Sequence, residues 1–386
     1  MAHLILHIGS HKTGTSSIQY VLTRSAEALE KAGAVYLQSN SMGKQAANAN
    51  SLGATEGKGA EFRATFADDV GDALIRPVAK VNVLSSENLF WLHDAGEIAR
   101  LAKLVRARFD SVSVIAYLRR QDMLALSHRK QVISPTPRPA ARFYGYQMSA
   151  LPEHQPHFHT YFDYHAKLEM WREAFGTDAM QVALFEREAL KNGDSVADFL
   201  SRAGLAVTLD EEPVRRNTAV GRERTLLSLA AKAAGIGGEA LKAIRRAASD
   251  EGKLLPARAE AEAFLDHWTE SNARLAQAWT LADGSPFAFT DDFSMYPEVG
   301  TDVWSDAEAR EAIAHVMQAA ASLQERSDKR KGRGGKGELR AGAKPRAQRG
   351  RKGPGKGHGG GGAHGAAGKP GFRKRKINRR ARKMSD

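Results

Sequence analysis

Short apolar runs alternate with longer amphipathic segments through the first half of the chain. Four of these runs are compact enough to be buried strands, and they cover Leu4–Ile8, Val81–Leu84, Val112–Leu118 and Met180–Phe185. Apolar residues at helical spacing predict helices over Ser16–Lys31, Gly96–Phe109, Met123–Val132 and Ser195–Ala203. Because strands that alternate with helices require crossover connections, the pattern predicts an α/β fold. We expect a mostly parallel sheet with helices on both faces.

Two segments interrupt this pattern. Gln38–Gly59 is rich in Asn, Ser, Gly and Ala, which predicts a loop. Pro135–His159 contains five prolines and four Phe or Tyr residues, and it predicts a long irregular segment of the kind that forms a binding loop or lid. His154, His157 and His159 are spaced too loosely for a metal site, so we interpret them as surface-loop histidines.

The C-terminal part changes character at Arg326. Glu223–Ala282 and Ser305–Gln324 have helical periodicity, whereas Gly, Lys, Arg, Pro and Ala dominate the residues that follow. We therefore expect one domain over residues 1–325, of which 223–325 is mainly helical, and a disordered basic tail over residues 326–386.

The net charge of +13 arises from this tail. Residues 326–386 contain 22 Lys or Arg and 3 Asp or Glu, so they carry +19 and leave −6 for the rest of the chain. The tail has one aromatic residue, Phe372. It is therefore expected to contact polyanions non-specifically, without reading a nucleic-acid sequence, and to be dispensable for chemistry.

The N-terminus and the amino-acid composition bear on location. His3–Ile8 runs directly into Gly9 and lacks the basic start, the length and the cleavage site of a signal peptide. The chain has no cysteine, which excludes disulfides and thiol chemistry, and no apolar stretch of the length that a membrane span needs. We expect a cytoplasmic protein with no membrane span.

A glycine loop, Gly9-Ser10-His11-Lys12-Thr13-Gly14-Thr15-Ser16-Ser17, separates the first strand from the first helix. In that position the backbone N–H groups and the helix N-terminus point toward one spot, which suits a phosphate. A nucleoside triphosphatase loop places lysine directly after the second glycine, whereas here Thr15 follows Gly14. The Val112–Leu118 run also ends in Arg119-Arg120, where a carboxylate would be needed to help hold Mg²⁺. ATP hydrolysis is therefore disfavoured.

These residues resemble the sulfotransferases that use 3′-phosphoadenosine-5′-phosphosulfate (PAPS). Lys12-Thr13-Gly14-Thr15-Ser16 is similar to the family's loop for the 5′-phosphosulfate, and Tyr117-Leu118-Arg119-Arg120-Gln121-Asp122 is similar to forms in bacterial members. Arg119 and Ser127 have the eight-residue spacing of the pair that holds the 3′-phosphate. The resemblance covers roughly residues 3–230 and implies a P-loop NTPase-like sulfotransferase fold.

The resemblance also implies roles for individual residues. Lys12 would stabilise the charge that develops on the leaving nucleotide, with no metal required. Arg119 and Ser127 would hold the 3′-phosphate, and the residues that would wrap the 5′-phosphate are Thr13, Gly14, Thr15, Ser16 and Ser17. Arg216, within Arg215-Arg216-Asn217, or Arg222 beyond it, is either a further phosphate contact or part of a solvated charge cluster.

The acceptor must lose a proton, and the sequence offers three candidates for the base. Glu87 follows a strand, so it is expected to face the same crevice as Lys12. Its other interpretation is a carboxylate that the dipole of a following helix favours. His11 is either a base or part of the fixed shape of the loop, and His128 is a weaker candidate.

The sequence therefore predicts a sulfotransferase that moves a sulfuryl group from PAPS to a hydroxyl or an amine and releases 3′-phosphoadenosine-5′-phosphate (PAP). Polysaccharides, lipids and small alcohols are all candidate acceptors. Two alternatives remain open. One is a P-loop nucleotide kinase, and the other is a polyanion- or nucleic-acid-binding protein that acts through its basic tail.

Overall fold

The computed structural model of the chain describes residues 1–39, 48–136, 138–207, 220–281 and 284–334. Contacts between residues divide the chain into two units, Met1–Gly332 and Arg333–Asp386.

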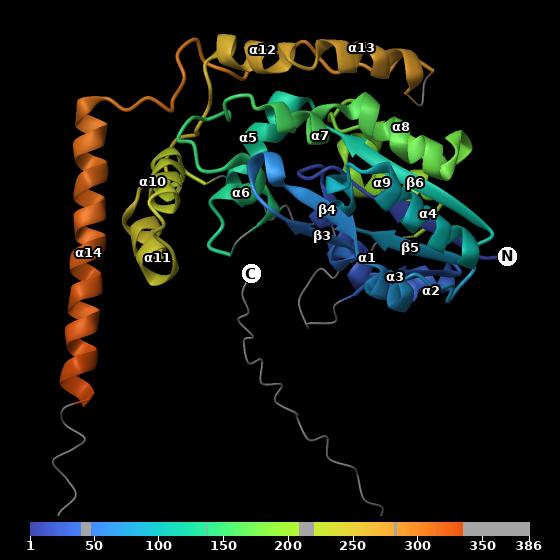
Figure 1. Cartoon of the computed structure of the whole chain (residues 1–386), viewed down its shortest axis with the longest axis horizontal. Helices are drawn as coiled ribbons and strands as arrows, with labels where there is room; N and C mark the ends of the chain where they lie inside the picture. The colour runs from blue at the N-terminus through green and yellow to red at the C-terminus, as the bar shows by residue number, and fades with distance from the viewer. Residues whose placement is uncertain (40–47, 137, 208–219, 282–283, 335–386) are drawn as a thin grey trace, which may run out of the picture. The chain divides into compact units, whose positions relative to one another are not determined.

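The first unit is built on a five-stranded sheet in the order β2-β5-β1-β6-β7, and every pairing in it is parallel (Figure 1). The strands are β1 (His3–His7), β2 (Ala34–Leu37), β5 (Val81–Ser85), β6 (Ser111–Leu118) and β7 (Met180–Leu184). The four strands predicted from apolar runs are all present, and β2 is an addition. β1 lies between β5 and β6, where the chain switches from one side of the sheet to the other. The carboxyl end of β1 is therefore the expected place for a ligand.

Successive side chains of each strand point to opposite faces of the sheet, and helices bury both faces. Leu4, Leu6 and Ile8 pack into a core cluster that includes side chains from α4 (Ala95–Arg108), α5 (Gln121–Val132) and α8 (Tyr164–Phe175). Ile5 packs into a second cluster, with side chains from α1 (Thr15–Arg24), α2 (Ala26–Lys31) and α9 (Ser195–Arg202). The predicted α/β fold, with a mostly parallel sheet covered on both faces, is confirmed.

The remaining elements surround this sandwich. β3 (Gly53–Glu56) and β4 (Arg63–Phe66) pair antiparallel in a separate two-stranded sheet. The other helices before the C-terminal part are α3 (Asp68–Leu74), α6 (Pro139–Tyr144) and α7 (His159–Phe162). The C-terminal part contains α10 (Arg222–Ala233), α11 (Gly238–Ala247), α12 (Arg258–Asp266), α13 (Thr269–Ala278) and α14 (Asp306–Gly334). Alanines on α14 pack against α10 and α11.

Two segments that the sequence predicts as irregular are partly regular and buried. The described part of 38–59 includes β3, which pairs with β4. Gly53, its first residue, lies so close to Asn88 that an added Cβ would be 2.8 Å from the Asn88 carbonyl oxygen. The segment 135–159 includes α6 and two core aromatics, Phe143 and Phe158, whose rings stack 5.3 Å apart. Phe143 and Phe158 therefore pack in the core, and the interpretation of this segment as a binding loop or lid stays a prediction.

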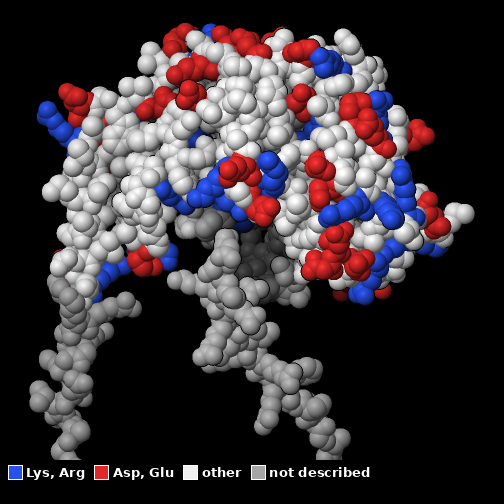
Figure 2. Space-filling model, viewed as in Figure 1, with Lys and Arg blue, Asp and Glu red and all other residues white. Residues whose placement is uncertain are grey.

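Helix ends also differ from the predictions. The helix predicted over 16–31 breaks at Ser25 into α1 and α2. α14 continues to Gly334, so the predicted start of the tail at Arg326 falls inside a helix. The rest of the predicted tail, residues 335–386, lies outside the described residues. Among the helices that the structure describes, none is long and apolar enough to cross a bilayer. Figure 2 shows acidic and basic side chains interspersed over the described surface on the face that it presents.

Candidate functional site

The glycine loop lies at the carboxyl end of β1 and is held against β6. The N–H of Ser10 donates to the carbonyl of Tyr117 at 2.9 Å. Gly9, Lys12 and Gly14 have φ angles of 62°, 64° and 77°, in the left-handed region that favours glycine. At Gly14 a Cβ would lie 2.4 Å from the hydroxyl oxygen of Ser195, so both the φ angle and the space require glycine.

The loop leads directly into the N-terminus of α1. No side chain caps this terminus, and its first turn carries no acidic residue. The first N–H groups of an α-helix have no partner within the helix, and they carry partial positive charge. Thr15, the first residue of α1, has a buried hydroxyl with no hydrogen-bond partner among the described residues. The helix end therefore presents donors that suit an anion.

A cavity of about 370 Å³ opens beside the loop. It collects side chains from the ends of β1, β5, β6 and β7 and from one face of α5. Its lining residues are Lys12, Gly14, Thr15, Ser16, Ser17, Glu87, Arg119, Ser127, Lys130, Gln131 and Phe185. Eight of these are residues that the sequence singles out, and the fold brings them together from positions more than a hundred residues apart.

Positive charge predominates in the cavity. Burial lowers the pKa of Lys12, and the neighbouring cations Lys130 and Arg119 lower it further, against the opposing effect of Glu87. Burial also lowers the pKa of Arg119, and burial together with Arg119 lowers that of Lys130. Three cations thus share a partly buried space with one carboxylate, which favours an anionic ligand.

Glu87 is the carboxylate that faces these cations. It begins the 3₁₀ turn Glu87–Trp91, directly after β5. Burial raises the pKa of Glu87, while the nearby charges of Lys12 and Arg138 and a hydrogen bond from Asn50 oppose that rise. A partly buried carboxyl group with a raised pKa is suited to accept a proton near neutral pH.

Arg119 and Arg120 follow β6 and point to different places. Arg119 lines the cavity, and its Nη1 donates to the carbonyl of Lys12 at 3.3 Å. Arg120 is fully buried, and its Nε lies 2.8 Å from Oδ1 of Asp122. Tyr296 donates to the other oxygen of Asp122 at 2.6 Å. The carboxylate nearest the end of β6 is therefore engaged within the protein core.

His11 lies behind the loop. Its Nδ1 is 2.7 Å from the hydroxyl of Tyr161, and its ring lies 5.0 Å from that of Trp91. Burial lowers the pKa of His11 to about 3, against a hydrogen bond with Asn88 that raises it. His128 is buried in the same cluster, with its Nδ1 2.8 Å from the hydroxyl of Tyr144. Neither histidine lines the cavity, so of the three base candidates the structure places only Glu87 there.

The remaining predicted residues have other positions. Thr13 is buried and donates its hydroxyl to the carbonyl of Ser10 at 2.5 Å, which fixes the loop instead of facing the cavity. Arg216, with Arg215 and Asn217, lies outside the described residues. Arg222 begins α10 and forms an ion pair with Glu308 at 2.6 Å, so its guanidinium is engaged away from the loop.

Three lining residues, Lys130, Gln131 and Phe185, were not predicted as site residues from the sequence. Lys130 was detectable, because it follows Ser127 by three residues on a predicted helix and so shares its face. Phe185 directly follows β7, and only the strand order brings that end beside β6. No local pattern indicates that arrangement.

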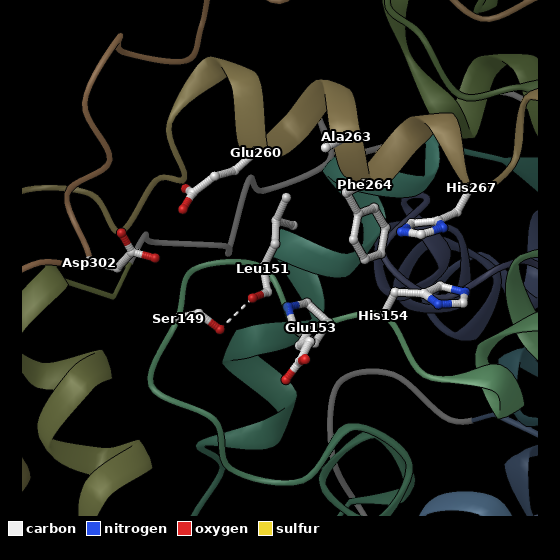
Figure 3. Close-up of a pocket in the computed structure, with 10 residues that line it drawn as sticks. Ser149, Leu151, Glu153, His154, Glu260, Ala263, Phe264, His267 and Asp302 are labelled. Atoms are coloured by element: carbon white, nitrogen blue, oxygen red, sulfur yellow. Dashed lines mark hydrogen bonds between the residues drawn. The ribbon is translucent and has the colours of Figure 1, made fainter.

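A second cavity, of about 320 Å³, lies between α12 and residues 149–154 (Figure 3). The rings of His154 and His267 stack there, with centroids 3.9 Å apart and planes 15° apart. Two rings that are parallel and stacked cannot both direct a nitrogen lone pair at one metal ion. No group of three or more His, Asp or Glu within the described residues has the arrangement of a metal site.

Lys167 is a buried cation behind the site, and it yields a prediction about stability. It is 1% exposed, and its Nζ donates to the carbonyl of Leu92 at 2.8 Å. Burial lowers the pKa of Lys167 to about 7. The unfolded chain binds the proton of the Lys167 ammonium group more tightly than the folded protein does. The free energy of unfolding should therefore rise with pH between about 7 and 10.5 as Lys167 loses that proton.

We expect Lys167→Met to raise the free energy of unfolding at pH 7 by about 1–4 kcal/mol, as for other buried charges replaced by apolar groups. The difference from the wild type should shrink as the pH approaches 10. Urea unfolding of both proteins at several pH values measures it. A difference that does not change with pH would contradict the lowered pKa.

Comparison with known proteins gives limited overlap. No family model matches the chain. An uncharacterized protein of Archaeoglobus fulgidus is 30% identical over 124 residues, which is 32% of this chain and 30% of that protein. This chain therefore spans less than a third of that relative's length. The crystal structure of a sulfotransferase from Alicyclobacillus acidocaldarius aligns with 63% of this chain and 99% of its own, at 14% identity and a TM-score of 0.30. A score of this size is not evidence of a shared fold.

Proposed function

We propose that this protein transfers a sulfuryl group from PAPS to a hydroxyl or an amine of an acceptor. One observation carries the proposal. A single cavity contains the loop lysine Lys12 and an uncapped helix N-terminus, together with Arg119 and Ser127, which follow a neighbouring strand. These are the two places that a nucleotide with a 5′ and a 3′ phosphate group would occupy.

The residues present suit such a ligand. The start of α1 offers backbone donors and the unpartnered Thr15 hydroxyl for the 5′-phosphate. Arg119 offers a planar guanidinium, and Ser127 offers a hydroxyl from the middle of α5, on the side that faces the cavity. PAPS supplies a sulfuryl group attached to a phosphate leaving group, so no step requires a metal ion in the site.

Two side chains then have chemical roles. Lys12 places positive charge beside the loop, where the 5′-phosphate oxygen gains charge as its bond to sulfur breaks. Glu87 accepts the proton of the acceptor as the new bond from the acceptor oxygen or nitrogen to sulfur forms. Lys12 favours the ionised form of Glu87, so the carboxylate stays available although burial raises its pKa.

The kinase alternative is less well supported by the same residues. Thr15 occupies the position of the lysine in a nucleoside triphosphatase loop. Asp122, the carboxylate after β6, is fully buried in its contacts with Arg120 and Tyr296. The alternative of polyanion binding through the tail concerns residues outside the described part of the chain, and it stays a prediction.

Transfer is tested by incubating the full-length protein with labelled PAPS and a panel of glycans, lipids and small alcohols or amines. The proposal predicts PAP release that depends on one class of acceptor, with the label on that acceptor. A parallel reaction with ATP and Mg²⁺ should release no ADP. ADP release in that reaction, with PAPS left intact by every acceptor, would favour the kinase.

Arg119→Ala tests the 3′-phosphate contact. We expect PAP affinity to fall by about 1.5–3 kcal/mol, the range for a hydrogen bond to a charged group, with little change for AMP. Calorimetric titrations with both nucleotides measure the change, and Arg119→Lys is the control that keeps the charge. Equal losses for PAP and AMP would mean that Arg119 does not contact the 3′-phosphate.

A further inference from the structure

Asn50 lies beside Glu87, the proposed base, although the two residues are far apart in the sequence. Asn50 begins the 3₁₀ turn Asn50–Leu52, which packs against the 3₁₀ turn Glu87–Trp91. The side-chain amide of Asn50 forms a hydrogen bond with the carboxylate of Glu87. Asn50 does not line the cavity itself, so it can act on the site only through Glu87.

Asn88 fixes the place of Asn50. Nδ2 of Asn88 donates to the carbonyl of Asn50 at 2.9 Å and to that of Gly53 at 3.4 Å. Asn88 also forms a side-chain hydrogen bond with His11, behind the glycine loop. Because Asn88 directly follows Glu87 in the chain, these bonds hold the backbone of Asn50 in a defined position relative to the Glu87 carboxylate.

The other end of the Asn50 amide has no such contact. Its Oδ1 is buried and has no hydrogen-bond partner within the part of the chain that the structure describes. A buried polar atom without a partner destabilises the folded protein, and an apolar side chain would avoid that cost. Packing alone therefore does not explain an asparagine at this position, whereas the hydrogen bond from its nitrogen to Glu87 does.

Two cations also act on Glu87. Lys12 of the glycine loop and Arg138, which precedes α6, both favour the ionised carboxylate. A charge attracts the carboxylate without fixing its direction, whereas a hydrogen-bond donor is directional. A general base must lie within hydrogen-bond reach of the proton that it accepts. Asn50 therefore supplies an orientation that the two cations do not.

We propose that Asn50 is a positioning residue, whose side-chain amide holds the carboxylate of Glu87 in the orientation from which it accepts the acceptor's proton. The inference rests on the proposed function, in which Glu87 is the base. Loss of the amide donor removes an interaction that favours the ionised carboxylate. Glu87 should then keep its proton up to a higher pH, in addition to losing its fixed orientation.

The test compares the wild type with Asn50→Ala, Asn50→Asp and Ser51→Ala. Asn50→Asp keeps the shape of the side chain and replaces the donor nitrogen with an oxygen. Ser51 is exposed on the same turn and does not line the cavity, so it is the matched control. For both Asn50 variants we expect kcat to fall about 10-fold or more, as for a misplaced catalytic group. The acid limb of the pH profile should move to higher pH, and PAP affinity should change less than about 2-fold.

A carbon-13 NMR titration of the Glu87 carboxyl group gives a readout that needs neither donor nor acceptor. The full-length protein is labelled at the side-chain carboxyl carbon of glutamate, and the Glu87 signal is the one that Glu87→Gln lacks. This signal should titrate at a higher pH in both Asn50 variants than in the wild type and in Ser51→Ala. An unchanged titration would overturn the assignment of Asn50, whatever reaction the protein catalyses.

The kinetic and NMR results together separate the possible failures. A shifted titration with unchanged kcat would overturn the positioning role, because the orientation of Glu87 would not matter to the reaction. If Glu87→Gln loses activity and neither Asn50 variant moves the acid limb, the assignment of Asn50 is overturned and the proposed function stands. If no acceptor takes the label from PAPS with the wild type, the proposed function fails, and the role of Asn50 fails with it even where the titration shifts.

Discussion

Lys12→Ala is expected to lower kcat about 100- to 1000-fold while weakening PAP binding far less. The larger effect on kcat follows because the charge on the 5′-phosphate oxygen develops only as the bond to sulfur breaks. Removing one preorganised donor from such a site costs this much in other enzymes. The measurement pairs kcat at saturating PAPS with calorimetric PAP affinity.

Lys12→Arg and Lys103→Met are the controls for this substitution. Arginine keeps the charge but cannot keep the same reach, so we expect partial activity. Lys103 is exposed on α4 and away from the cavity, so its substitution should leave kcat unchanged. Parallel losses in kcat and PAP affinity for Lys12→Ala would show a binding role without one in the chemical step.

Glu87→Gln should lower kcat about 100-fold or more, within the range for loss of a general base. Burial raises the pKa of Glu87, so wild-type activity should fall on the acid side at a pH above the usual carboxyl range. Above that pKa the carboxylate is ionised and can accept the proton, and below it the group is protonated and inactive. The variant should lack this acid limb, which a pH profile of kcat would reveal.

Glu262→Gln, on an exposed position of α12, is the matched control and should keep both kcat and the acid limb. An acid limb that persists unchanged in Glu87→Gln would assign it to another group. Full activity of Glu87→Gln at every pH would remove Glu87 as the base. His11 would not replace it, because its ring is buried behind the loop in contact with Tyr161.

The sequence predicts the loop well because its geometry is local. The spacing of Gly9 and Gly14, between an apolar run and a helical pattern, is sufficient to predict a turn that exposes a helix N-terminus. Arg119 and Ser127 were also predictable, since a residue at a strand end and one on the next helix stay close along the chain.

Features that depend on contacts between residues far apart in the chain could not be predicted from the sequence. The aromatic residues between 135 and 159 suggest ligand contacts as readily as core packing, and only the fold shows that Phe143 and Phe158 are buried. His11 is a second case. Its position in the loop suggests a catalytic base, and only the fold shows that its ring is buried. Tyr161, which fixes its ring, lies 150 residues away along the chain. β2 is short and directly follows a helix, so periodicity alone did not separate it.

The proposal that this protein uses PAPS can be tested by comparing the binding of PAP and AMP to the unmodified protein. Two charge-assisted contacts to the 3′-phosphate should make PAP bind at least about 100-fold more tightly than AMP. Calorimetry at one fixed salt concentration gives both affinities without knowledge of the acceptor. A PAP preference of that size would support binding of the 3′-phosphate by Arg119 and Ser127. Equal affinities for the two nucleotides would show that this cavity does not bind PAPS as proposed.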